Sequence, residues 1–127
     1  MSHSQIGQDL FVLRELKEKR GGFFVEIGGH DGVTHSNTYL LEKEYEWEGI
    51  VVEPAKRFHT ALESSRNCTL DFRAVWGLSG EAVTFNEVPG RLSALSTLAH
   101  YSDCDHWAMV RGAANFMTLK RCPLPIS

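Results

Sequence analysis

The chain has 127 residues, of which 43% are hydrophobic and 23% are charged, and its formal net charge is −3. These values are ordinary for a globular protein and predict one domain with a modest core. The charge balance offers no basic surface for nucleic acid or an anionic membrane, and no apolar run approaches the length of a membrane span. The N-terminus lacks a basic segment followed by an apolar one, so we expect a cytoplasmic protein. Three widely spaced cysteines predict reduced thiols rather than a disulfide framework.

The chain begins with a predicted helix and a predicted strand. Residues 4–19 carry apolar side chains at helical spacing, with Ser4 as the expected N-cap. Residues 23–27 read as a strand that is apolar on both faces except at Glu26. Such a run is typical of a strand in the middle of a parallel sheet rather than at its edge.

Helices and strands continue to alternate after this point. We expect a loop over 28–35, a helix beginning near 36–38, a strand over 49–53, a helix from 54 to about 64, a strand over 69–75, a turn at 78–81 and a short antiparallel strand over 82–88. This order predicts an α/β fold, one half of a doubly wound and largely parallel Rossmann-like sheet. The pattern then weakens, with a predicted helix over 105–114 and a predicted strand over 115–120.

A glycine-rich turn follows the first strand, and an acid ends the second. The turn is Gly28-Gly29-His30-Asp31-Gly32, and Glu53 lies 21 residues after Gly32. This spacing matches a βαβ unit in which the turn receives a nucleoside-bearing ligand and the acid binds ribose hydroxyls. The turn does not follow the dinucleotide glycine pattern, and its carboxylate would repel a pyrophosphate. S-adenosylmethionine, with a sulfonium and no phosphate, fits better, and a nicotinamide dehydrogenase is the weaker alternative.

Each of the two strand carboxylates has two interpretations. A buried, ionised Glu26 needs hydrogen-bond donors or a cation, so it either holds loop amides or contacts the amino group of the cofactor. Glu53 ends its strand before Pro54, and ribose binding is favoured there over helix capping. His30 and His35 flank the turn, and His30 is a weak candidate for the general base, although most loop histidines are solvated.

One further cluster resembles a metal site. Residues 103–106 read Asp-Cys-Asp-His, but such close neighbours do not converge on one ion, and a helix N-cap explains the acids. We therefore predict no metal.

Taken together, the motifs resemble the FkbM-like S-adenosylmethionine-dependent methyltransferases. The resemblance covers roughly residues 4–90 and is carried by Ser4-Gln5-x-Gly7-Gln8-Asp9, Phe23-Phe24-Val25-Glu26-Ile27-Gly28, Asp31-Gly32, Ser36-Asn37-Thr38-Tyr39-x-Leu41-Glu42, Trp47-x-Gly49, Glu53-Pro54, Arg66-Asn67, Ala74-Val75 and Ser79-Gly80-Glu81. It implies a class I methyltransferase fold and methyl transfer to an oxygen, such as a hydroxyl of a sugar or small metabolite.

The resemblance also implies a set of cofactor-binding residues. Glu26, Gly28, Gly29, His30, Asp31 and Gly32 would hold the methionine part, and Glu53 would hold the ribose. Arg73, Ala74 and Val75 would flank the adenine, and Ser4 and Gln5 would lie over the cofactor. Pro54, next to Glu53, belongs to the same expected set.

The C-terminal part departs from this family. Residues 91–127 contain no match to the acidic motif of the fourth strand, so residues 1–90 form the expected cofactor-binding half of a single, partial domain. Two hypotheses follow: an O-methyltransferase, or a catalytically incomplete S-adenosylmethionine-binding module. A central first strand without its usual neighbour needs either residues 115–120 or another chain beside it, which predicts a homodimer or an exchanged segment.

Overall fold

A computed structural model describes residues 1–77, 80, 82–88, 96–98 and 115–120. The chain divides into two compact units, Met1–Phe72 and Arg73–Ser127, each of which is described by itself. The predicted division at residue 90 concerned function and stays a prediction. The turn predicted at 78–81, apart from Gly80, and the helix predicted over 105–114 lie outside the described residues, as does the Asp-Cys-Asp-His cluster. No helix in the described ranges is long and apolar enough to cross a membrane.

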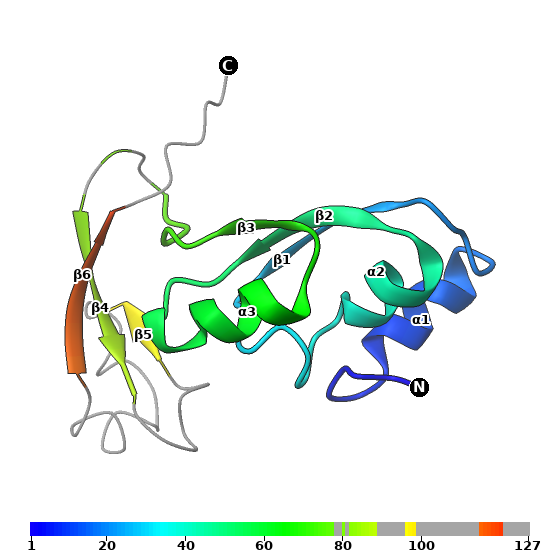
Figure 1. The fold of residues 1–127 in the computed structure, drawn as a ribbon, viewed down its shortest axis with the longest axis horizontal. Helices are drawn as coiled ribbons and strands as arrows, with labels where there is room; N and C mark the ends of the chain where they lie inside the picture. The colour runs from blue at the N-terminus through cyan, green and yellow to red at the C-terminus, as the bar shows by residue number, and fades with distance from the viewer. Residues whose placement is uncertain (78–79, 81, 89–95, 99–114, 121–127) are drawn as a thin grey trace. The chain divides into compact units, whose positions relative to one another are not determined.

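The first unit is a small α/β structure with a parallel sheet, as predicted (Figure 1). Its elements are α1 (Gln8–Glu15), β1 (Phe23–Ile27), α2 (Tyr39–Tyr45), β2 (Glu48–Val52), the 3₁₀ helix η1 (Lys56–Phe58), α3 (His59–Ser65) and β3 (Thr69–Asp71). The strands lie in the order β1-β2-β3, and all pairs are parallel. The third strand is shorter than predicted.

Strand β1 lies at the edge of this sheet, so the prediction of a central position was wrong for the part of the chain that the structure describes. Its side chains alternate between buried and exposed positions. Phe24 and Glu26 are buried, whereas Phe23, Val25 and Ile27 are 59–65% exposed. An apolar run is compatible with burial on both faces, but it does not show which neighbours are present.

The core of the first unit lies between the sheet and its helices. Figure 1 shows α2 and α3 on the same face of the sheet. Val51 of β2, Leu40 of α2 and Leu62 of α3 are at most 3% exposed. Leu62 is fully buried and contributes about 2 kcal/mol or more through the apolar surface that it removes from water.

Helix α1 is shorter than the sequence pattern predicts. The helix begins after Gly7, whose φ of 82° is left-handed, and Ser4 therefore does not cap it. At the other end Lys17 and Glu18 both have positive φ, which stops the helical turn.

Trp47 closes the end of the first unit opposite the glycine turn. The residue before it, Glu46, has a φ of 58° and ends α2. The indole N–H of Trp47 donates to the backbone oxygen of Lys19 at 2.8 Å, and the side chain is buried. The ring lies where a Cβ of Gly22 would be, so only glycine fits at that position.

The second unit contains an antiparallel sheet. Strand β4 (Ala82–Glu87) lies between β5 (Thr97–Leu98) and β6 (Asn115–Lys120). The strands predicted over 82–88 and 115–120 are therefore confirmed. However, β6 pairs with β4, with Phe85 opposite Met117, and it is not a strand of the β1-β2-β3 sheet, where one alternative expected it.

Candidate functional site

The glycine turn is tied to the end of β2 by its own backbone. The N–H groups of Gly28 and Gly29 both donate to the oxygen of Val52, at 2.8 and 3.1 Å, and the N–H of Gly32 donates to Gly29 at 2.9 Å. A Cβ at Gly29 would overlap Cγ1 of Val51, so the close approach of turn and strand requires glycine. Because these amides have partners within the chain, the turn does not offer them to a phosphate group.

Glu53 holds the beginning of the loop that joins β1 to α2. Its carboxylate accepts a hydrogen bond from the backbone N–H of His30 and another from that of Ala55, both at 2.8 Å. Burial raises the pKa of Glu53, although these two N–H groups and the nearby His30 and His59 oppose the rise. Each carboxylate oxygen keeps a second lone pair, so Glu53 can still accept a hydroxyl group.

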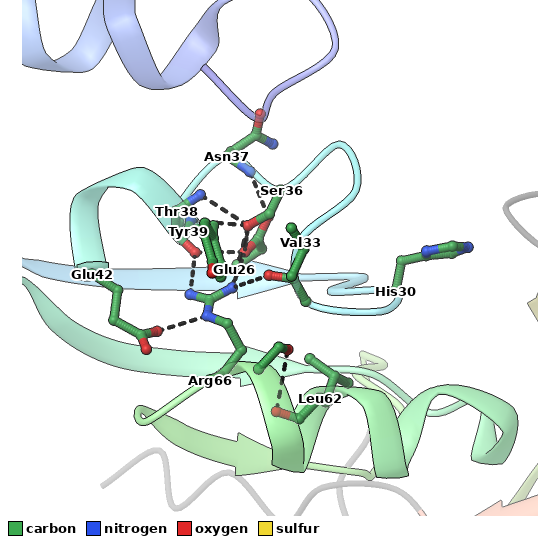
Figure 2. Close-up of polar contacts among 12 residues, drawn as sticks. Glu26, His30, Val33, Ser36, Asn37, Thr38, Tyr39, Glu42, Leu62 and Arg66 are labelled. Atoms are coloured by element: carbon green, nitrogen blue, oxygen red, sulfur yellow. Dashed lines mark hydrogen bonds and ion pairs between the residues drawn. The ribbon is translucent and has the colours of Figure 1, made fainter. Parts of the chain in front are cut away.

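Glu26 holds the other end of the same loop (Figure 2). Its carboxylate accepts hydrogen bonds from the hydroxyls of Ser36 and Thr38 and from the backbone N–H of Asn37. The guanidinium of Arg66 lies 3.3 Å from the same carboxylate. These four partners favour the structural interpretation of Glu26 over a contact with the cofactor.

Arg66 is the central residue of this network, and no pattern in the sequence gave it that role. Its side chain is fully buried between two acids: it reaches Glu26 through Nη1 and Glu42 through Nε, at 2.6 Å. It also donates to the oxygen of Gly32 and to the hydroxyl of Thr38, at 3.2 and 2.8 Å. A buried arginine bound to two carboxylates and a loop carbonyl is costly to disrupt, because each partner would lose its compensation.

His30 and Asp31 occupy the middle of the turn. His30 has a φ of 50°, and its ring lies on Phe58 with 3.9 Å between centroids. Figure 2 shows the imidazole pointing away from the Arg66 network. Asp31 accepts the N–H groups of Val33 and Thr34 at 2.9 and 2.7 Å. Burial alone would raise the pKa of Asp31, but the hydrogen bonds from Thr34 and Val33 outweigh it and lower that pKa.

The N-terminal segment reaches the same loop. Ser4 forms an isolated parallel bridge with His35, which has a φ of 62°. Asp9, which is fully buried, accepts hydrogen bonds from Ser2 and Ser4. In the sequence, Asp9 is marked only as part of the Ser4–Asp9 motif, and its hydrogen-bond partners could not be inferred there.

The structure thus brings together many of the predicted cofactor-binding residues. Those around one loop are Ser4, Glu26, Gly28, Gly29, His30, Asp31, Gly32 and Glu53. Pro54 follows directly, and Gln5 is exposed. Arg73, Ala74 and Val75 belong to the second unit, so their place beside the adenine stays a prediction.

A pocket of about 430 Å³ lies at the amino-terminal ends of the three parallel strands, whereas the glycine turn lies at their carboxyl ends. Phe23, Glu48 and Thr69, which stand at the beginnings of the three strands, line it together with Glu42 and Cys68. Burial, with Glu42 close by, raises the pKa of the Cys68 thiol to about 11, which keeps it protonated and unreactive at neutral pH. This pocket is separate from the loop that Glu26 and Glu53 hold.

Comparison with known proteins gives no family for the chain: no family model, curated protein or solved structure matches it.

Proposed function

We propose that the chain is an S-adenosylmethionine-dependent methyltransferase that acts on a hydroxyl group of a sugar or small metabolite. The observation that carries the proposal is the link between Glu53 and the glycine turn. The carboxylate follows β2, the turn follows β1, and the 2.8 Å bond from the His30 N–H joins them at the carboxyl edge of two adjacent parallel strands. Ligands of open α/β sheets bind at this edge.

The chemistry of the turn supports this cofactor over a dinucleotide. Gly28, Gly29 and Gly32 use their N–H groups within the chain, and Asp31 adds a negative charge. A pyrophosphate would find repulsion and few donors there. An adenosyl sulfonium carries a positive charge at its reacting centre and presents two ribose hydroxyls that a carboxylate accepts.

The reaction would be a direct displacement. A lone pair of the acceptor oxygen forms the new bond to the methyl carbon as the carbon–sulfur bond breaks, and the protein mainly aligns the three atoms. S-adenosylhomocysteine is the second product, and the hydroxyl proton must pass to a base. His30 is the candidate base, since its ring lies at the turn and points away from the buried Arg66 network (Figure 2).

Binding of S-adenosylhomocysteine to the intact chain, measured by calorimetry, tests the cofactor assignment. We expect wild-type binding, and we expect Glu53→Ala to weaken it by at least about tenfold, the factor for one lost hydrogen bond to a charged group. Glu48→Gln is the matched control, because Glu48 is an exposed acid at the other end of β2. Absence of binding to the wild-type chain would refute the proposal.

A second candidate function is a binding module that holds the cofactor without turnover. The observation in its favour is that β1 forms the edge of the described sheet and presents Phe23, Val25 and Ile27 on an exposed face. This alternative includes a homodimer, since an open apolar edge invites pairing.

Two measurements separate the candidates. Transfer of a labelled methyl group to a panel of sugars and small hydroxyl compounds favours the enzyme, whereas cofactor binding without transfer favours the module. Light scattering over a wide concentration range tests the homodimer, and a strictly monomeric protein would contradict it.

A further inference from the structure

Asp9 fastens the segment that precedes its own helix. Its carboxylate accepts the hydroxyls of Ser2 and Ser4 at 2.6 and 2.7 Å, and the backbone N–H groups of His3 and Leu10 at 3.0 and 2.8 Å. Burial alone would raise the pKa of Asp9, but these four hydrogen bonds lower it to about 2. The carboxylate is therefore ionised at neutral pH, and the four donors that stabilise it are all neutral. We call residues 2–7 the N-terminal clasp.

The clasp is attached to the loop between β1 and α2. Ser4 pairs with His35 of that loop, and the ring of His3 lies 4.6 Å from the ring of Tyr39, the first residue of α2. This is the loop whose two ends are held by Glu26 and Glu53. Asp9 is thus connected, through Ser4, to the proposed cofactor site.

The clasp is built so that it can be released. Gly7 joins it to α1 with a φ of 82°, and a Cβ there would meet no atom within 4 Å. Gln5 is exposed and Ile6 is 86% exposed, so their side chains contribute little packing. Because little other apolar surface holds this segment, its closure depends mainly on the hydrogen bonds to Asp9, on the bridge to His35 and on the contact between the rings of His3 and Tyr39.

We propose that Asp9 is a positioning residue that closes the N-terminal clasp over the β1–α2 loop and so slows the release of the bound cofactor. This inference rests on the proposed function. Asp9 does not contact the cofactor in this role; it acts through Ser4. The clasp would open by rotation at Gly7. Whether it is open or closed would affect the rate at which the bound cofactor dissociates more than the rate at which the cofactor binds.

The test compares Asp9→Asn with the wild-type chain. An asparagine has nearly the same shape, but its NH₂ group would face donors that need an acceptor, so the clasp should open. Hydrogen exchange of residues 2–10 reports the clasp, and the dissociation rate of S-adenosylhomocysteine reports its effect on the ligand. We expect faster exchange and a dissociation rate about tenfold higher, with little change in the association rate.

Two further variants keep the test decisive. The variant Ser2→Ala removes one hydroxyl donor while Asp9 stays charged and Ser4, a predicted cofactor-binding residue, is unchanged, and it carries the test if Asp9→Asn fails to fold. Trp47→Phe removes the 2.8 Å indole bond at the other end of the first unit and controls for a general loss of stability. We expect Trp47→Phe to leave both the exchange of the clasp and the dissociation rate unchanged.

The outcomes distinguish this inference from the proposed function. If the wild-type chain binds S-adenosylhomocysteine and the clasp variants exchange faster but release it at the wild-type rate, only the inference is wrong. Unchanged exchange in the clasp variants would also overturn it, because Asp9 would then not hold the segment. A wild-type chain that binds no S-adenosylhomocysteine would overturn the proposed function, and the inference with it.

Discussion

Glu26 and Glu53 hold the two ends of one loop, but they do so with different chemistry. Glu26 is surrounded by two hydroxyls, a backbone N–H and the buried guanidinium of Arg66. The carboxylate of Glu53 accepts hydrogen bonds from two backbone N–H groups, and burial raises its pKa. The first carboxylate is neutralised by a cation within the fold, whereas the second retains acceptor capacity. The comparison teaches that, of two acids on adjacent strands, one within β1 and one directly after β2, the acid with fewer compensating partners is the better candidate for ligand binding.

The largest expected effect on stability comes from removing the cation that Glu26 binds at its end of the loop. Arg66→Ala should lower the free energy of unfolding by about 3–5 kcal/mol, because it leaves the buried Glu26 without its cation and leaves Glu42 with Lys43 as its cation. Urea denaturation measures the loss. Arg14→Ala is the control: the Arg14–Glu15 pair is mostly exposed, and its removal should change stability by less than about 0.5 kcal/mol. Equal losses in the two variants would contradict the assigned role of Arg66.

The Glu53 end is sensitive to the spacing between the turn and β2. Gly29→Ala should cost about 3 kcal/mol, because the new methyl group would overlap Val51. The double variant Gly29→Ala/Val51→Ala should recover part of that loss, which a double-mutant cycle measures. Gly77→Ala, where a Cβ would have open space, is the matched control. Additive effects in the cycle would show that the overlap is not the cause.

Asp9 provides a third case, a saturated carboxylate whose donors are all neutral. Its pKa is about 2 in the folded chain, against 3.8 as the ordinary value. The resulting stability, on the order of 2 kcal/mol, is fully present above the unfolded-state pKa and is lost as the pH falls toward 2. Acid denaturation followed by circular dichroism should show this loss in the wild-type chain and not in Asp9→Asn. Glu15→Gln, an exposed change on the same helix, should leave the wild-type acid dependence in place.

The smallest effect is the order of titration at the glycine turn. Carboxyl carbon chemical shifts should place the midpoint of Glu53 above 4.5 and that of Asp31 below 3.8. The contribution of Glu53 to stability is then greatest while it is protonated and falls as the pH rises through its raised pKa, whereas that of Asp31 falls as the pH drops. The reverse order of the two midpoints would contradict the view that Glu53 is less compensated by hydrogen bonds than Asp31.

The local elements of the fold could be predicted from the sequence because short apolar runs between turn residues define them. Strands β1 and β6 have the predicted bounds, and β2 differs by one residue at each end. The position of β1 in its sheet could not be predicted in this way, because it depends on which segments pair with it. The side chains of Phe23, Val25 and Ile27 are apolar but exposed, so their residue type does not show whether another strand or helix covers this face of β1.

The candidate site was predictable only where spacing along the chain carries the information. The Gly28–Gly32 turn and Glu53 meet because parallel strands end at one edge of a sheet. Arg66 is 40 residues from Glu26, and nothing in the local sequence pairs them. The role of Asp9 was missed because the helix was predicted to begin at Ser4, whereas Ser2 and Ser4 fold back onto the Asp9 carboxylate and the helix begins after Gly7.

The enclosed indole of Trp47 gives the first unit its own optical reporter. Trp76 and Trp107, the other two tryptophans, belong to Arg73–Ser127. A chain carrying Trp76→Phe and Trp107→Phe would fluoresce from one ring only, and loss of its burial would shift that emission to longer wavelength. The fluorescence of Trp47 would then follow the melting of residues 1–72 alone, and circular dichroism would follow the whole chain. Coincident midpoints would show one transition, and separate midpoints would show two.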